Sequence, residues 1–297
     1  MKRRHFFWYS LLFLSSCATT KIQSEGTSSG LANNLPTKLS LAITDVKGIE
    51  NLQRDFGAFR EALERVLETK IEFFPVENHI AAAPALLSNQ IDLALAGPSE
   101  YVILQARAKV VPIIALERPS YYTVIRVRAD SGIESLEQLK GKTIGMRTEG
   151  ATASHLGSTK LLIDAGLDPK SDFKTLMVHD RGLQALKNGE IDAWGDSKSR
   201  HQKFLEETGW SEREFPILAQ GSPLPNDVLV AKFNLEPAIL DEIRSRMLQN
   251  KDELVAAILA SPSNLKYQES EFLGAKDSDY DMIRQVYKAI GQDKAIQ

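Results

Sequence analysis

Residues 148–157, with the sequence TEGATASHLG, form the segment of this chain best suited to binding chemistry. They follow a predicted strand, KTIGMR, and precede a predicted helix, STKLLIDAG, so the pattern is strand, small-residue turn and helix. The first amides of a helix have no partners within it, and the helix dipole is positive at that end. Such a helix start favours an oxyanion, and the hydroxyls of Thr152 and Ser154 could add donors. Capping of the helix by these hydroxyls is the plainer alternative.

The sequence carries no signature of a catalytic centre. It has no G-x-S-x-G, no H-E-x-x-H and no P-loop lysine motif. Five histidines, at positions 5, 79, 155, 179 and 201, show no metal-ligand spacing. We therefore predict a protein that is not an enzyme and that uses no cofactor and no metal.

The N-terminal segment MKRRHFFWYSLLFLSSC is typical of an export signal, with three basic residues before a short apolar run. Its ending, Leu-Ser-Ser-Cys, resembles the lipobox of bacterial lipoproteins, and Cys17 is the only cysteine in the chain. Residues 1–16 are therefore predicted to be a lipoprotein signal peptide. We expect an exported periplasmic or cell-surface protein that is anchored to the membrane through a lipid on Cys17.

The rest of the chain has the composition of a globular protein with room for about two domains. The whole chain has 297 residues, of which 43% are hydrophobic and 25% are charged, and its net charge of −3 argues against nucleic-acid binding. Residues 17–38 are rich in Ser, Thr, Gly and Asn and indicate a flexible tether.

From Leu39 onwards, short apolar runs alternate with amphipathic helices. Strands are predicted at 39–46, 70–76 and 91–97, with helices at 51–68 and 79–89 between them. This β-α-β-α-β order predicts an α/β fold with a mainly parallel sheet, in which ligands bind at the carboxyl ends of strands. We predict one lobe from residues 39–122 plus 228–297 and a second from residues 123–227.

Several segments together resemble one known family. They occur in the order and spacing of the PhnD-like phosphate, phosphite and phosphonate-binding proteins, which are substrate-binding components of ABC importers. The segments are QIDLALAGPSEYVI, YYTVIRVRADSGIESLEQLKGKTIGM, LLIDAGLDPKSDF, LQALKNGEIDA and SPLPNDVLV. The resemblance implies a two-lobed type II periplasmic-binding fold of the Venus flytrap kind, with a hinge between the lobes. It also implies a monomer that closes on a small anion and delivers it to an ABC permease.

The resemblance assigns a binding role to the segment at 151–154, with one departure. Family members typically carry Ser-Thr-Ser where this chain has Ala151, Thr152 and Ala153, so two hydroxyls are missing. A hydrogen bond to a charged group is worth about 1.5–3 kcal/mol, so the loss matters unless another group replaces it. Ser154 and His155 are nearby candidates, and the backbone amides remain.

The family cleft implies four further ligand contacts. Ser99 and Tyr101 lie at its mouth, and the family tyrosine donates its hydroxyl to the ligand. His179 corresponds to a histidine that reaches the oxyanion, and Asp227 to an acidic residue that takes a substrate amine. As alternatives, Tyr101 packs at the start of a helix without contacting a ligand, and His179 lies in a solvated loop.

Three other positions depart from the family pattern. Arg181 stands where small residues are usual and either donates to the ligand or points to solvent. Trp194 either narrows the cleft or fills the core. Ser199 aligns with a family glutamate, and Asp196 is close by.

A sensory module with the same fold, signalling to a membrane receptor with a diverged ligand, is the alternative function. Divergence at residues 151–153 is what a change of role would produce.

Overall fold

The computed structural model describes residues 35–77 and 81–297. The predicted signal peptide, Cys17 and most of the predicted tether lie outside these residues. Among the helices that are described, none is both long and apolar enough to cross a membrane.

Residues 35–77 and 81–297 build two mixed sheets. The first has the strand order β11-β4-β10-β3-β1-β2 and the second β7-β6-β8-β5-β9. The strands are β1 (Lys38–Ile43), β2 (Lys70–Phe73), β3 (Leu93–Ala96), β4 (Val111–Leu116), β5 (Tyr122–Val127), β6 (Thr143–Met146), β7 (Lys174–Met177), β8 (Ala193–Ser197), β9 (Ile217–Pro223), β10 (Asp227–Ala231) and β11 (Phe272–Gly274).

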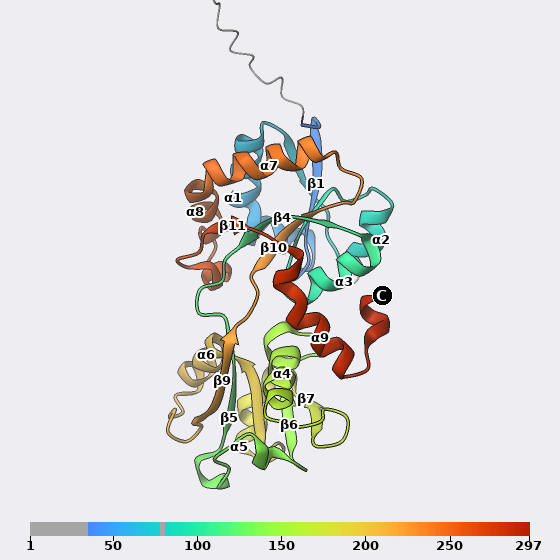
Figure 1. Cartoon of the computed structure of the whole chain (residues 1–297). Helices are drawn as coiled ribbons and strands as arrows, with labels where there is room; N and C mark the ends of the chain where they lie inside the picture. Colours follow the sequence, from blue (N-terminus) through green and yellow to red (C-terminus); the bar gives the residue numbers. More distant parts are fainter. Residues whose placement is uncertain (1–34, 78–80) are drawn as a thin grey trace, which may run out of the picture. The chain divides into compact units, whose positions relative to one another are not determined.

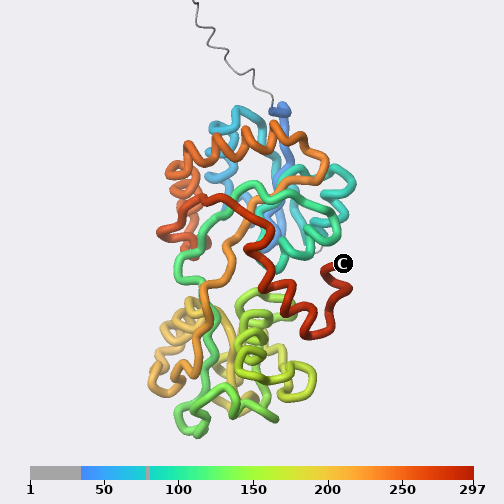
Figure 2. The backbone as a smooth tube through the Cα atoms, in the orientation of Figure 1, coloured from blue at the N-terminus to red at the C-terminus, as the bar shows by residue number. Residues whose placement is uncertain are grey.

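The pairing explains why the sheets are mixed. β1 pairs in parallel with β2 and β3, as the β-α-β pattern predicts. β10 lies antiparallel between β3 and β4 because the chain returns to the first sheet only after completing the second. In the second sheet β6 is parallel to β7 and β8, whereas β5 is antiparallel to β8 and β9. Figure 2 traces the two crossings, after β4 and before β10.

Helices cover both faces of each sheet (Figure 1). They are α1 (Ile49–Leu67), α2 (Ala82–Leu87), α3 (Pro98–Ala108), α4 (Ser158–Asp164), α5 (Gly182–Lys187), α6 (Lys198–Thr208), α7 (Pro237–Gln249), α8 (Lys251–Leu259) and α9 (Asp281–Ala289).

Strand alternation divides the core of the first lobe into two layers, because successive side chains of a strand point to opposite faces. On β1, Leu41 and Ile43 pack in one layer with side chains of α1, α7 and α8. Ala42, between them, faces the other layer with α2, α3 and α9. The small side chains of β3 on this second face, Ala94 and Ala96, let these helices approach closely.

Trp194 of β8 fills the core of the second lobe. Its side chain is fully buried, and its ring centroid lies 3.9 Å from that of His201. A Cβ at Gly182 would come within 2.2 Å of the indole, so only glycine fits at the start of α5. The tryptophan thus takes the core-filling alternative, and it does not line the cavity described below.

Candidate ligand-binding site

A cavity of about 220 Å³ lies where the strands of both sheets end. It is smaller than the roughly 300–1,000 Å³ typical of pockets for drug-sized molecules, so it suits a small ligand. From the first sheet, Asp45 follows β1, Gly97 follows β3 and Arg118 follows β4. The second sheet contributes Arg147 after β6 and Ser197 at the end of β8. The cavity therefore occupies the position at which open α/β sheets bind ligands.

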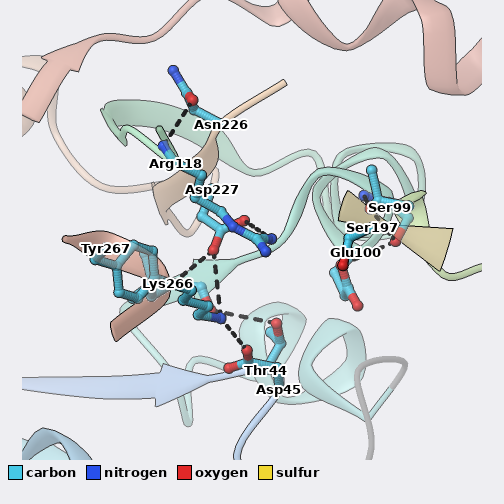
Figure 3. Close-up of polar contacts among 12 residues, drawn as sticks. Thr44, Asp45, Ser99, Glu100, Arg118, Ser197, Asn226, Asp227, Lys266 and Tyr267 are labelled. Carbon is cyan, nitrogen blue, oxygen red and sulfur yellow. Dashed lines mark hydrogen bonds and ion pairs between the residues drawn. The ribbon is translucent and has the colours of Figure 1, made fainter. Parts of the chain in front are cut away.

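Asp227 organises the charges on the first-sheet side of the cavity (Figure 3). Its Oδ2 accepts a hydrogen bond of 2.6 Å from the Tyr267 hydroxyl, and its Oδ1 lies 3.4 Å from Nη1 of Arg118. Nζ of Lys266 lies 3.7 Å from Oδ2 of Asp227 and 2.6 Å from Oδ2 of Asp45. Burial is the largest single influence on the pKa of Arg118 and acts to lower it, but Asp227 together with Tyr121, Tyr267 and Asp45 outweighs burial, so the pKa is raised. The pKa of Lys266 is raised in the same way, because Tyr267, Asp45 and Asp227 outweigh its burial. Both cations therefore stay charged beside the cavity.

The second-sheet side carries two further arginines and a buried carboxylate. Arg147 and Arg200 both line the cavity and both pair with Asp180. Asp196 is buried, and its Oδ2 has no hydrogen-bond partner among the residues that the structure describes, although Nε of Arg200 lies 3.7 Å away. Burial raises the pKa of Asp196 to about 6, while the Ser197 amide and Arg200 act in the opposite direction. Acidic and basic groups thus face each other at close range.

The predicted segment at 151–154 lines the cavity. Ala151, Thr152, Ala153 and Ser154 all contribute to its wall, at the start of a π-helical segment, η3 (Thr152–Gly157), that continues directly into α4. The Ser154 hydroxyl is buried and has no hydrogen-bond partner within the described chain. The Nδ1 atom of His155 accepts a hydrogen bond of 3.0 Å from the Gly150 amide.

Thr152 joins the two lobes. Its Oγ1 accepts a hydrogen bond of 3.2 Å from the Ser99 amide and donates one of 3.1 Å to the Ser99 hydroxyl. Ser99 is the second residue of α3, whose N-cap, Gly97, has no side chain to satisfy that amide. The threonine of one lobe therefore caps a helix of the other lobe.

Replacing Thr152 with valine, which has nearly the same shape, is expected to lower the free energy of unfolding by about 1–2 kcal/mol. The Ser99 amide would lose its cap, and such losses typically cost this much. Urea denaturation measures the effect, with Thr148→Val at an exposed position as the control. Equal stability of the two variants would show that the bond between the lobes contributes nothing.

Two predicted contacts lie away from the cavity wall. The Tyr101 hydroxyl donates a 2.6 Å hydrogen bond to Oδ1 of Asp277, and its ring packs against Tyr280. His179 is exposed, with a left-handed backbone (φ 50°), and its amide donates to the Arg147 carbonyl. Their roles toward a ligand stay predictions, as does that of Ser99, whose hydroxyl accepts a hydrogen bond from Thr152 and donates one of 3.0 Å to Oε2 of Glu100, both residues of the wall.

The sequence analysis identified none of the four basic side chains that line the cavity. Arg118 lies just after β4, and Arg147 ends the predicted strand KTIGMR, so a place at a strand end was a usable signal. Lys266, in the short helix Pro262–Tyr267, and Arg200, in α6, gave no such signal because only the folded chain brings them to the cavity. Arg181, which was considered, does not line the cavity and lies 3.7 Å from Glu190. Within residues 35–77 and 81–297, no group of three or more His, Cys, Asp or Glu could hold a metal ion.

Two α/β lobes with a charged cavity at the strand ends define a type II periplasmic substrate-binding protein. The chain belongs to the family of periplasmic substrate-binding proteins of phosphonate ABC transporters, whose model matches residues 42–280. This confirms the family that the sequence motifs indicated. Because its members are periplasmic binding components of ABC transporters, membership implies export and confirms that the chain is not an enzyme.

Individual relatives are distant but similar over most of their length. The phosphate-import protein PhnD of Mycolicibacterium smegmatis is 23% identical, covering 95% of this chain and 94% of the relative. PhnD1 of Prochlorococcus marinus, solved with methylphosphonate, has a TM-score of 0.63 at 18% identity, covering 87% of this chain and 100% of that one. XAC2383 of Xanthomonas citri, solved with ATP, has a TM-score of 0.68 at 16% identity, covering 87% and 98%. At these identities the solved structures establish the fold.

Proposed function

We propose that this protein captures a small oxyanion of the phosphonate, phosphite or phosphate kind between its two lobes and delivers it to an ABC permease. The observation that carries the proposal is the convergence of four basic side chains on one small cavity. These are Arg118 and Lys266 from one lobe and Arg147 and Arg200 from the other. Basic groups on both sides of the cavity favour lobe closure around an anion, and the permease recognises the closed form.

The proposed ligand contacts begin at the start of η3. The amides of residues 152–154 and the Ser154 hydroxyl are proposed to bind an oxyanion there, beside Ala151, and their place in the cavity wall supports this. The Thr152 hydroxyl joins them in this proposal only after it leaves Ser99. Asp227 is proposed to take an amine if the ligand carries one. Tyr101 contacts the ligand in this proposal only after its hydroxyl leaves Asp277, and His179 only after its loop turns toward the cavity.

The lobes are proposed to comprise residues 39–122 with 228–297, and residues 123–227, in a monomer. Cys17 is proposed to carry the lipid that anchors the protein to a membrane. The transport function of the family and of the relatives favours an importer component over a sensor.

A thermal-shift screen tests the proposed function. The chain from residue 18 onwards is heated with phosphate, phosphite, methylphosphonate, 2-aminoethylphosphonate, acetate and methanesulfonate. A ligand at a hundred times its Kd adds about 2.7 kcal/mol of stability, so a phosphorus oxyanion should raise the melting temperature by several degrees. A screen in which no phosphorus oxyanion does so would overturn the proposal.

A further inference from the structure

Two arginines of the second lobe converge on a single oxygen atom. Nε of Arg147 lies 3.1 Å from Oδ1 of Asp180, and Nη1 of Arg200 lies 3.2 Å from the same Oδ1. The arginines come from different elements, the end of β6 and the first turn of α6, and both line the cavity. A place where two guanidinium groups meet one carboxylate oxygen has the geometry that an oxyanion requires.

The carboxylate that now holds this place is weakly attached. The Asp180 side chain is 68% exposed and belongs to a three-residue helical turn, His179–Arg181. Exposed ion pairs of this kind contribute little to stability, so exchange of the carboxylate oxygen for another anion costs little. The two arginines keep about a third of their side-chain surface exposed and are accessible from the cavity.

A second carboxylate lies near one of the two arginines. Oδ2 of Asp196 lies 3.7 Å from Nε of Arg200, and the Asp196 side chain is buried. Arg200 therefore lies between two carboxylates, with Nη1 near Asp180 and Nε near Asp196. Asp180 is the exposed one of the two and so the one that an anion from solvent can replace.

We propose that Arg147 and Arg200 form an oxyanion clamp, and that Asp180 occupies the clamp as a competing carboxylate until the ligand displaces it. The proposal rests on the proposed function and deepens it, because it assigns the anion to the second-lobe side of the cavity. The ligand class is a small anion with at least two free oxygens, which paired guanidinium groups bind through parallel N–H donors. The clamp supplies donors at a site where Ala151 and Ala153 have no hydroxyls.

Isothermal titration with methylphosphonate, phosphite and phosphate tests the clamp in the wild type and four variants. Arg147→Gln is expected to reduce the affinity for the most tightly bound of these anions roughly ten- to a hundredfold, which is the effect of losing one charged hydrogen bond. Arg200→Lys keeps the charge near Asp196 but loses the fork, and about a tenfold loss is expected. Asp180→Asn removes the competitor and should tighten binding several-fold. Arg181→Gln, on an exposed arginine outside the cavity wall, is the matched control and should change nothing.

The outcomes separate the two proposals. If the wild type binds an anion but Arg147→Gln and Arg200→Lys bind it equally well, the clamp is overturned and the proposed function stands. If Asp180→Asn weakens binding, the carboxylate positions the arginines rather than competing, and the displacement step is overturned. If the wild type binds none of the three anions, the proposed function fails and the clamp with it. Melting temperatures without ligand verify folding, and Arg147→Lys replaces the glutamine variant if that one unfolds.

Discussion

Asp227→Ala is expected to lower the free energy of unfolding by roughly 3 kcal/mol. The carboxylate is buried, accepts the Tyr267 hydroxyl bond and faces both Arg118 and Lys266. Removing one partner from a buried ion pair leaves charge uncompensated and typically costs about 3–5 kcal/mol. Arg118 and Lys266 retain some contact with solvent, which places the expected loss at the lower end of that range. Chemical denaturation at neutral pH measures it.

Asp227→Asn separates charge from shape. Its amide oxygen can still accept the hydrogen bond from Tyr267, but it no longer neutralises Arg118 and Lys266. A loss smaller than that of the alanine variant is expected, and equal stability of wild type and both variants would contradict the role of Asp227 as the centre of this cluster. The same variants test the ligand role of Asp227. If Asp227 binds an amine, its replacement should reduce the affinity of the protein for 2-aminoethylphosphonate more than its affinity for methylphosphonate.

Asp196→Asn is expected to stabilise the protein at neutral pH and to remove a pH dependence of the wild type. Burial raises the pKa of Asp196 from its ordinary 3.8 to about 6 in the folded protein. The folded state therefore favours the protonated carboxyl, so the stability from this group is present below about pH 4 and is lost as the pH rises through about 6. Each pH unit between the two pKa values is worth about 1.4 kcal/mol, so the total is roughly 3 kcal/mol.

The measurement is urea denaturation of wild type and variant between about pH 4 and about pH 7. The difference between the two proteins isolates Asp196 from the other carboxylates. Asp164→Asn, at an exposed carboxylate paired with Lys160, is the control and should give a difference that stays constant above about pH 5. A constant difference for Asp196→Asn as well would show that its pKa is not raised.

The sequence by itself determined the class of fold and one wall of the cavity. Alternation of apolar runs with amphipathic helices reports which faces are buried, and this is a local property that survives without knowledge of the tertiary contacts. The helix after β6 was predicted in the same way, but helical structure begins at Thr152, inside the segment predicted to be a turn. Residues 151–154 line the cavity, and their contact with a ligand stays a prediction.

Only the tertiary structure decided which side chains meet there. Thr152 bonds to Ser99 across 53 residues, and Arg118 pairs with Asp227 across 109. No periodicity encodes such pairs, because they depend on where the chain returns to the first sheet as β10 and how η3 of one lobe faces α3 of the other. For the same reason the convergence of Arg147 and Arg200 on Asp180 could not be predicted. The three residues come from three separate elements, and their side chains meet only once folding has brought these elements to one edge of the second sheet.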